Sequence, residues 1–187
     1  MKIISRNFPK MRGDVKVDYL FQTFENIHEL AKMRGGVVGK LCTFLSDVYK
    51  NGIPETQTKS ISELPLLICK SEKRPDQITS IAAEANARGN GRQQHDVLQS
   101  YFLDNDRFTI ATETPVWRDG VLGHIDLIRI ADDVVEVWDY KPDAHRETKA
   151  ASQILRYRNF LAKCTGIPLS NIQAGYFDEK NAYFLKF

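Results

Sequence analysis

The sequence lacks the features that would place the protein in a membrane or outside the cell. No run of 18 or more consecutive apolar residues occurs in its 187 residues, so no membrane span is predicted. Residues 1–14 are too polar and too interrupted for a secretory signal peptide. The only cysteines are Cys42, Cys69 and Cys164, and their odd number and wide spacing fit reduced thiols rather than a disulfide framework. We therefore expect an intracellular, cytoplasmic protein.

A large excess of one charge is also missing. Lys and Arg number 26, Asp and Glu number 24, and the formal net charge is +2. This balance does not indicate a nucleic-acid partner, although it is compatible with a local basic track. Hydrophobic residues make up 42% of the chain, which is enough for one compact domain with a core of its own.

The first 80 residues combine helical spacing with a polar segment. Apolar residues at 17, 20, 21, 24, 27 and 31 follow helical spacing, which resumes over residues 37–48 and stops at Asn51-Gly52. This pattern predicts two helices or one kinked helix. Residues 52–75 are rich in Pro, Ser, Thr and Lys and predict a loop with little order. We expect residues 1–80 to form a helical region packed on a core made by residues 81–187.

The second half changes from helical to strand periodicity. Helical composition begins near Ile78, is interrupted at residues 88–91 and continues to Phe102. The sequence then predicts the following elements: strands at 108–117, 121–130 and 134–141, a helix from about 148 to 162, and a last hairpin of 172–177 with 182–187. The predicted fold class is α/β, with a mixed central sheet flanked by helices.

Two carboxylates stand on strand faces that are otherwise apolar. Asp126 shares its face with Ile128 and Ile130, and Asp139 follows Val135 and Val137 on the next strand. An unpaired buried charge costs several kcal/mol, and two neighbouring carboxylates also repel each other. A divalent cation relieves both costs, and oxygen ligands select the hard ions Mg²⁺ or Mn²⁺. The pattern therefore predicts a metal site.

Lys141 lies one pleat beyond Asp139 and completes a set suited to phosphodiester hydrolysis. Its ammonium cannot bind a cation, but it can stabilise charge on a phosphate oxygen or orient a water molecule. The alternative is a structural salt bridge between Lys141 and Asp139. Glu113 on the preceding strand could contact the site, but we expect an exposed strand glutamate there.

Four short motifs resemble those of the RecB-like branch of the PD-(D/E)XK nuclease superfamily. Gly91 to His95 resembles its Gly-x-x-x-His helix, and residues 123–126 (Gly-His-Ile-Asp) resemble its Gly-x-Ile-Asp strand. Residues 138–141 (Trp-Asp-Tyr-Lys) resemble its Asp-Tyr-Lys strand, and residues 153–157 its Gln-x-x-x-Tyr helix. Each motif alone is weakly specific, but four in the same order over residues 88–160 are a strong signal.

The resemblance implies a set of metal ligands. His95, Asp126 and Asp139 would bind the ion, with help from the main-chain carbonyl of Tyr140. For His95 the alternative is a histidine satisfied within the core. Some relatives hold an iron–sulfur cluster through one upstream and three downstream cysteines, but this chain has only Cys164 in the downstream region, so no cluster is expected.

The resemblance also implies the reaction and its catalytic groups. Lys141 would be catalytic, while Gln153 and Tyr157, one helical turn apart, would position Lys141 or a substrate phosphate; plain helix packing is the alternative for this pair. The expected function is Mg²⁺- or Mn²⁺-dependent hydrolysis of DNA by an exonuclease that acts on duplex ends or single strands. A structure-specific or restriction-type endonuclease and an inactive nucleic-acid-binding module remain the alternatives.

Overall fold

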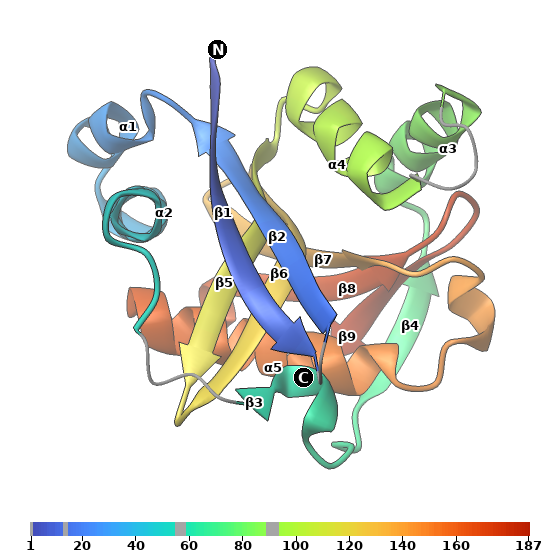
Figure 1. Ribbon diagram of the computed structural model, residues 1–187. Helices are drawn as coiled ribbons and strands as arrows, with labels where there is room; N and C mark the ends of the chain where they lie inside the picture. Colours follow the sequence, from blue (N-terminus) through green and yellow to red (C-terminus); the bar gives the residue numbers. More distant parts are fainter. Residues whose placement is uncertain (1, 13–14, 55–58, 89–93) are drawn as a thin grey trace.

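The computed structural model describes residues 2–12, 15–54, 59–88 and 94–187. Within them the chain forms one large mixed sheet with helices on both faces (Figure 1). The strands lie in the order β1-β2-β5-β6-β7-β8-β9-β4, and β3 pairs with β6. β7 and β8 are parallel, as are β3 and β6, and the other neighbours are antiparallel. The expected mixed α/β architecture is confirmed.

Strands and helices follow one another in short groups along the chain. The described strands are β1 Ile3–Arg12, β2 Val15–Phe24, β3 Lys59–Ser60, β4 Lys70–Arg74, β5 Thr109–Arg118, β6 Val121–Ala131, β7 Val134–Tyr140, β8 Ile172–Phe177 and β9 Ala182–Lys186. The described helices are α1 Ile27–Met33, α2 Gly36–Asn51, α3 Ile78–Arg88, α4 Gln94–Asn105 and α5 Ala150–Thr165, with 3₁₀ turns η1 Ile61–Glu63, η2 Ala144–Arg146 and η3 Leu169–Asn171. Among the described residues, no helix combines the length and the apolar character needed to cross a membrane.

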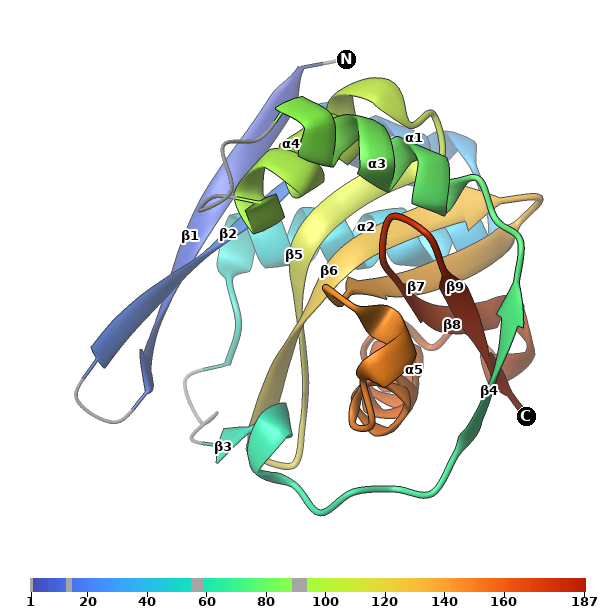
Figure 2. The same cartoon turned by 90° about the vertical axis from the view of Figure 1, so that its right-hand side faces the viewer.

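The hydrophobic core is divided between the two faces of the sheet. On one face, α3 and α4 cover Trp138 and Phe177, and on the other, α5 and α2 cover Val135 and Val137 (Figure 2). The alternation along β7 therefore sends Trp138 and Tyr140 toward α4, whereas Asp139 follows the valines to the α5 side. The prediction that a buried strand face ends in Asp139 is confirmed.

The predicted helix over residues 17–31 is wrong in its first part. Residues 15–24 form β2, which pairs with β1 through ten residues, and helix α1 begins only at Ile27. Apolar residues at 17, 20, 21 and 24 fit a helix, but they belong to a run rich in aromatic and β-branched residues, which favours a strand. Phe21 and Thr23, two residues apart, are fully buried, while Leu20, next to Phe21, is 49% exposed. The period of two prevails because pairing with β1 satisfies the backbone of the whole segment.

The division into a helical region of residues 1–80 and a separate core also needs correction. β1 and β2 join the sheet through β5, β3 pairs with β6, and β4 forms the opposite edge beside β9. Residues 59–63 and 70–74, expected to be loop, thus carry two short strands and a 3₁₀ turn. Polar composition misled the prediction because an edge strand such as β4 needs few apolar residues when one side faces solvent.

The predictions for the second half are confirmed to within three residues at each end. Tight turns account for this precision. Asp119 and Gly120 both have positive φ, at 50° and 79°, as the two-residue turn between β5 and β6 requires. Asp132 and Asp133, in the turn between β6 and β7, also have positive φ, at 50° and 61°. These turns set the register of three consecutive strands and thereby the positions of their carboxylates.

Candidate active site

The site lies where β6 and β7 stop pairing. Their ladder runs from Ala131 opposite Val134 to Leu127 opposite Trp138, so Asp126 and Asp139 come one residue beyond its last pair. Both side chains are buried, at 6% and 1% exposure. The Tyr140 N–H, no longer needed by the ladder, donates a hydrogen bond of 2.8 Å to Asp126 Oδ2. The two strands thus part around the carboxylates, and both line one cavity.

β5 contributes a third acidic side chain, Glu113, that we expected to be exposed. It is 9% exposed and sits between the paired residues Thr112 and Thr114 with a φ of 47°. A non-glycine residue in this conformation interrupts the strand and redirects its own side chain, and such strain gathers at functional sites. Gln99 on α4 donates a hydrogen bond of 2.6 Å to Glu113 Oε1.

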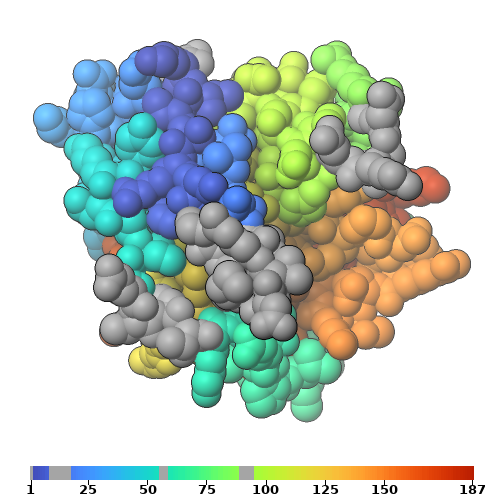
Figure 3. All heavy atoms as spheres, viewed as in Figure 1, coloured from blue at the N-terminus to red at the C-terminus, as the bar shows by residue number. Residues whose placement is uncertain are grey.

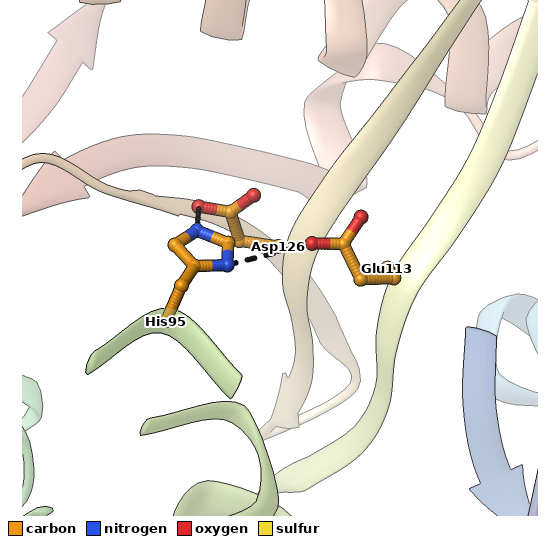
Figure 4. Close-up of side chains that lie close together, drawn as sticks. All are labelled: His95, Glu113 and Asp126. Carbon is orange, nitrogen blue, oxygen red and sulfur yellow. Dashed lines mark hydrogen bonds and ion pairs between the residues drawn. The ribbon is translucent and has the colours of Figure 1, made fainter. Parts of the chain in front are cut away.

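His95, on α4, contacts the carboxylates of Asp126 and Glu113. Its Nε2 lies 3.1 Å from Asp126 Oδ2, and its Nδ1 lies 3.6 Å from Glu113 Oε1 (Figure 4). One ligand atom from each of the three residues lies within 4.8 Å of the others. Gln99, one turn further along α4, places its Nε2 2.9 Å from His95 Nδ1 and so holds the ring between the two strands.

Asp139 forms an ion pair with Lys141. The Lys141 side chain is 23% exposed, so its ammonium reaches from the buried carboxylate into the cavity. The structural salt bridge that we considered is therefore present, and it lies inside the site rather than away from it. The two interpretations of Lys141 do not exclude each other, because an ion pair also holds an ammonium in place.

Gln153 and Tyr157 enter the cavity from α5. Gln153 donates a hydrogen bond of 2.6 Å to the Tyr157 hydroxyl, and both line the cavity with Lys141. Tyr157 passes so close to β6 that a Cβ atom at Gly123 would lie 2.5 Å from its Cε1 atom. Gly123 is thus required for the close approach of α5 rather than for a turn.

These side chains line a cavity of about 500 Å³, which is within the range of ligand sites. β5, β6, β7, α4 and α5 supply the groups described above, while β2 and η1 form two further walls. The described residues that line it are Asp18, Tyr19, Leu20, Gln22, Ser60, Ile61, Ser62, His95, Asp96, Gln99, Ser100, Glu113, His124, Asp126, Asp139, Lys141, Gln153 and Tyr157. Figure 3 views the molecule from the side of the β1–β2 hairpin, with α4 beside it and η1 below.

Crowding of acids changes the pKa values in the cavity. Burial and then the charge of Asp126 raise the pKa of Glu113 to about 7. Burial and Asp126 likewise raise the pKa of Asp139 to about 7, although Lys141 opposes this. Burial disfavours the His95 imidazolium, but the neighbouring carboxylates, Asp126 first, raise the pKa of His95 to about 9. Burial and the charge of Asp126 thus keep both carboxyl groups partly protonated near neutral pH.

Asp126, Lys141 and Tyr157 each have one protonation state at neutral pH. Burial works against ionised Asp126, but His95, Lys141 and the Tyr140 N–H together lower its pKa. Burial also opposes the Lys141 ammonium, yet Asp139 and Asp126 raise the pKa of Lys141 above its ordinary value. Burial and the same two carboxylates raise the pKa of Tyr157 well above its ordinary range. At neutral pH, Lys141 is therefore a cation and Tyr157 a neutral hydroxyl.

The donor set of His95, Glu113 and Asp126 fits a divalent cation. Two carboxylate oxygens suit Mg²⁺ and Mn²⁺, and an imidazole nitrogen is accepted more readily by Mn²⁺. A cation would also offset the burial and the repulsion by Asp126 that raise the pKa values of Glu113 and Asp139. Binding requires that the His95 nitrogen lose its proton.

Most of the residues predicted for the site meet in this one cavity. His95, Asp126, Asp139, Lys141 and the Gln153–Tyr157 pair all line it. The Tyr140 side chain points to the α4 face, where its hydroxyl donates to Glu179 Oε1 at 2.9 Å, so only its main chain is near the carboxylates. Ligation by Asp139 and by the Tyr140 carbonyl stays a prediction. The Gly91 end of the first motif lies outside the described residues.

Gln99 was not predicted for the site, and Glu113, which could contact the site, was expected to be exposed. Gln99 follows His95 by four residues on a helix, a spacing that places both on one face, and this signal was available. Glu113 left no comparable signal, because its left-handed conformation does not follow from the identity of a glutamate.

Comparison of the chain with protein-family models, with curated proteins and with solved structures gave no match. The site must therefore be interpreted from its own geometry.

Proposed function

We propose that the protein is a metal-dependent nuclease that hydrolyses DNA phosphodiester bonds, acting on single strands or duplex ends. We also propose that its core belongs to the PD-(D/E)XK type and its site to the RecB-like branch. The observation that carries the proposal is the convergence, in one cavity, of a His–Glu–Asp donor set with the Asp139–Lys141 ion pair. Metal ligands beside a fixed ammonium are what hydrolysis of a phosphodiester needs.

The positions of the residues in the cavity suggest a separate role for each of them in the proposed reaction. His95, Glu113 and Asp126 would hold the ion. Asp139 lies close enough to Asp126 for the two carboxylates to repel each other, and the ion would relieve this repulsion. When bound, Mg²⁺ or Mn²⁺ supplies a Lewis acid and lowers the pKa of a coordinated water. Lys141 remains a cation and stabilises negative charge on the phosphate oxygens.

Gln153 and Tyr157 line the cavity together with Lys141. Because Tyr157 stays neutral, its hydroxyl accepts from Gln153 and still has a proton to donate toward a phosphate oxygen. This supports the assigned role of positioning Lys141 or the substrate rather than accepting a proton from water.

The test compares end-labelled single-stranded, duplex and covalently closed circular DNA, each with Mg²⁺, Mn²⁺ or chelator. We expect cleavage of linear substrates with either ion and none in chelator. Cutting of the closed circle would identify an endonuclease on the same site. Cleavage that persists undiminished in excess chelator, or DNA binding with no turnover under any metal, would overturn the proposal.

A further inference from the structure

The turn between β8 and β9, residues 178–181, lies beside the end of β7, where Lys141 leaves the sheet. β7 and β8 are parallel, and the last pair of their ladder is Tyr140 with Phe177. The next N–H along β7, that of Lys141, donates a hydrogen bond of 2.8 Å to the Phe177 carbonyl oxygen. The main chain of Lys141 is therefore fixed to the last residue of β8, immediately before the turn.

Asp178 holds the chain that follows Lys141. Its side chain is buried, and its Oδ2 accepts a hydrogen bond of 2.9 Å from the Ala144 N–H at the start of η2 (Figure 1). Its other oxygen, Oδ1, accepts from the N–H groups of Lys180 and Asn181 at 2.7 and 2.6 Å. One carboxylate thus joins the β8–β9 turn to η2, and it uses both of its oxygens to do so.

Glu179 holds the residue that precedes Lys141. The Tyr140 hydroxyl donates a hydrogen bond of 2.9 Å to Glu179 Oε1, which also accepts from the side-chain amide of Asn86 on α3. Between Lys141 and η2, Asp143 has a φ of 58°. A residue other than glycine keeps this conformation only where its surroundings hold it. The chain on both sides of Lys141 is therefore held in place.

We propose that the β8–β9 turn positions the ammonium of Lys141, and that Asp178 is the principal positioning residue. The role of Lys141 in hydrolysis rests on the proposed function, whereas the contacts that hold it do not. Three consecutive residues, 177–179, accept hydrogen bonds from Lys141, from the residue before it and from the start of η2.

The flexibility of a lysine side chain explains why such support is needed. An ammonium on four flexible carbons has a defined position only when its main chain is fixed as well as its charged end. Asp139 holds the charged end of Lys141, and the β8–β9 turn holds the main chain. Asp178 and Glu179 are not among the described residues that line the cavity, so they act through Lys141 and not on a substrate.

Asp178→Asn tests the contact to η2. An amide offers one acceptor oxygen where the carboxylate offers two, so the variant can keep the hydrogen bonds of the turn or the one from Ala144, but not both. The candidate metal ligands His95, Glu113 and Asp126 lie on other elements, α4, β5 and β6. Calorimetric titration should therefore show Mn²⁺ affinity within a few-fold of the parent.

Two measurements on the full chain follow Lys141. The first is acetylation of metal-free protein by an N-hydroxysuccinimide ester, read for each lysine by mass spectrometry. A paired ammonium reacts when local opening frees it, so Asp178→Asn should speed the acetylation of Lys141 by about fivefold or more. Lys40, which donates to the Gly166 carbonyl, should react at the parent rate. The second is cleavage of linear single-stranded DNA with Mn²⁺, in which kcat should fall by about 10- to 100-fold and KM should change little.

Asp106→Asn is the matched control. Asp106 is also a buried carboxylate that uses both oxygens, accepting from the Phe108 N–H and from Arg129, and it does not line the cavity. This variant should be less stable than the parent, yet leave Lys141 acetylation and kcat unchanged. An effect equal to that of Asp178→Asn would show general destabilisation and overturn the inference.

The remaining outcomes separate the inference from the proposed function. Parent-like acetylation of Lys141 in Asp178→Asn overturns the inference. If that variant does not fold, Glu179→Ala, which removes only the acceptor for Tyr140, decides by the same measurements. Faster acetylation of Lys141 in a protein that cleaves no DNA would refute the proposed function and support the inference. Cleavage by the parent, with unchanged acetylation in the variant, would do the reverse.

Discussion

Replacing Glu113 by Gln removes a buried acidic group of the cavity that we expected from the sequence to be exposed. The substitution keeps the shape of the side chain and an oxygen that can accept from Gln99. It ends the repulsion between Glu113 and Asp126, and it removes the negative charge of one of the three candidate metal ligands. We therefore expect opposite effects with and without metal.

The size of the effect on the metal-free protein follows from the pKa of Glu113. Its pKa rises from 4.5 to about 7 on folding, so the folded protein binds the proton more tightly and loses stability as pH rises between these values. A neutral Gln avoids that loss. Glu113→Gln should raise the free energy of unfolding by about 3 kcal/mol at pH 8 and by under about 1 kcal/mol at pH 5.

The effect on metal binding has the other sign. Loss of an outer-sphere partner of a metal ligand already lowers affinity by about 10- to 100-fold, so loss of a ligand charge should lower Mn²⁺ affinity by about 100-fold or more. Urea unfolding in chelator at both pH values and calorimetric titration with Mn²⁺ measure the two effects. Glu84→Gln on α3 makes the same chemical change at a side chain that bonds Tyr101, and it should alter neither quantity. A variant that binds Mn²⁺ as tightly as the parent, or is less stable at pH 8, would refute the reasoning.

Three further predictions concern the charged groups and the cysteines. Lys141→Ala should bind Mn²⁺ within a few-fold of the parent but lose about two to four orders of magnitude in cleavage rate, and parent-like turnover would reduce the Asp139–Lys141 pair to a purely structural role. Because the pKa values of His95 and Glu113 are about 9 and about 7, Mn²⁺ affinity should rise with pH up to about 9 with proton release, measurable by calorimetry in buffers of different ionisation enthalpy. Three scattered cysteines are too few to hold an iron–sulfur cluster, so protein purified without air should be colourless. Iron and sulfide in stoichiometric amounts would contradict this prediction.

The second half of the fold could be predicted because its signals are local. Two-residue turns with positive φ set the register of β5, β6 and β7, and alternation then places Asp126 and Asp139 on buried faces. The spacing of Gln153 and Tyr157 likewise follows from helical geometry alone. Each of these inferences depends on residues close together in the chain.

The first half could not be predicted in the same way because its partners are distant. Apolar positions in residues 17–24 fit both a helix and a strand, and only pairing with β1 decides between them. β4 is a strand because β9, more than a hundred residues later, offers it an open edge. The conformation of Glu113 depends on how β5 packs between β6 and α4, which no local pattern encodes.

The charges that line the cavity bear on the order in which a metal ion and DNA would bind. Among the described residues that line it, five carboxylates face one ammonium and two imidazoles: Asp18, Asp96, Glu113, Asp126 and Asp139 against Lys141, His95 and His124. The ammonium is already held by Asp139. A phosphodiester is itself an anion, and in a partly buried site its repulsion by these groups is weakly screened. On the proposed function, a divalent cation must therefore enter before the DNA, so that the ion proposed to activate water would also make the cavity able to bind a phosphate.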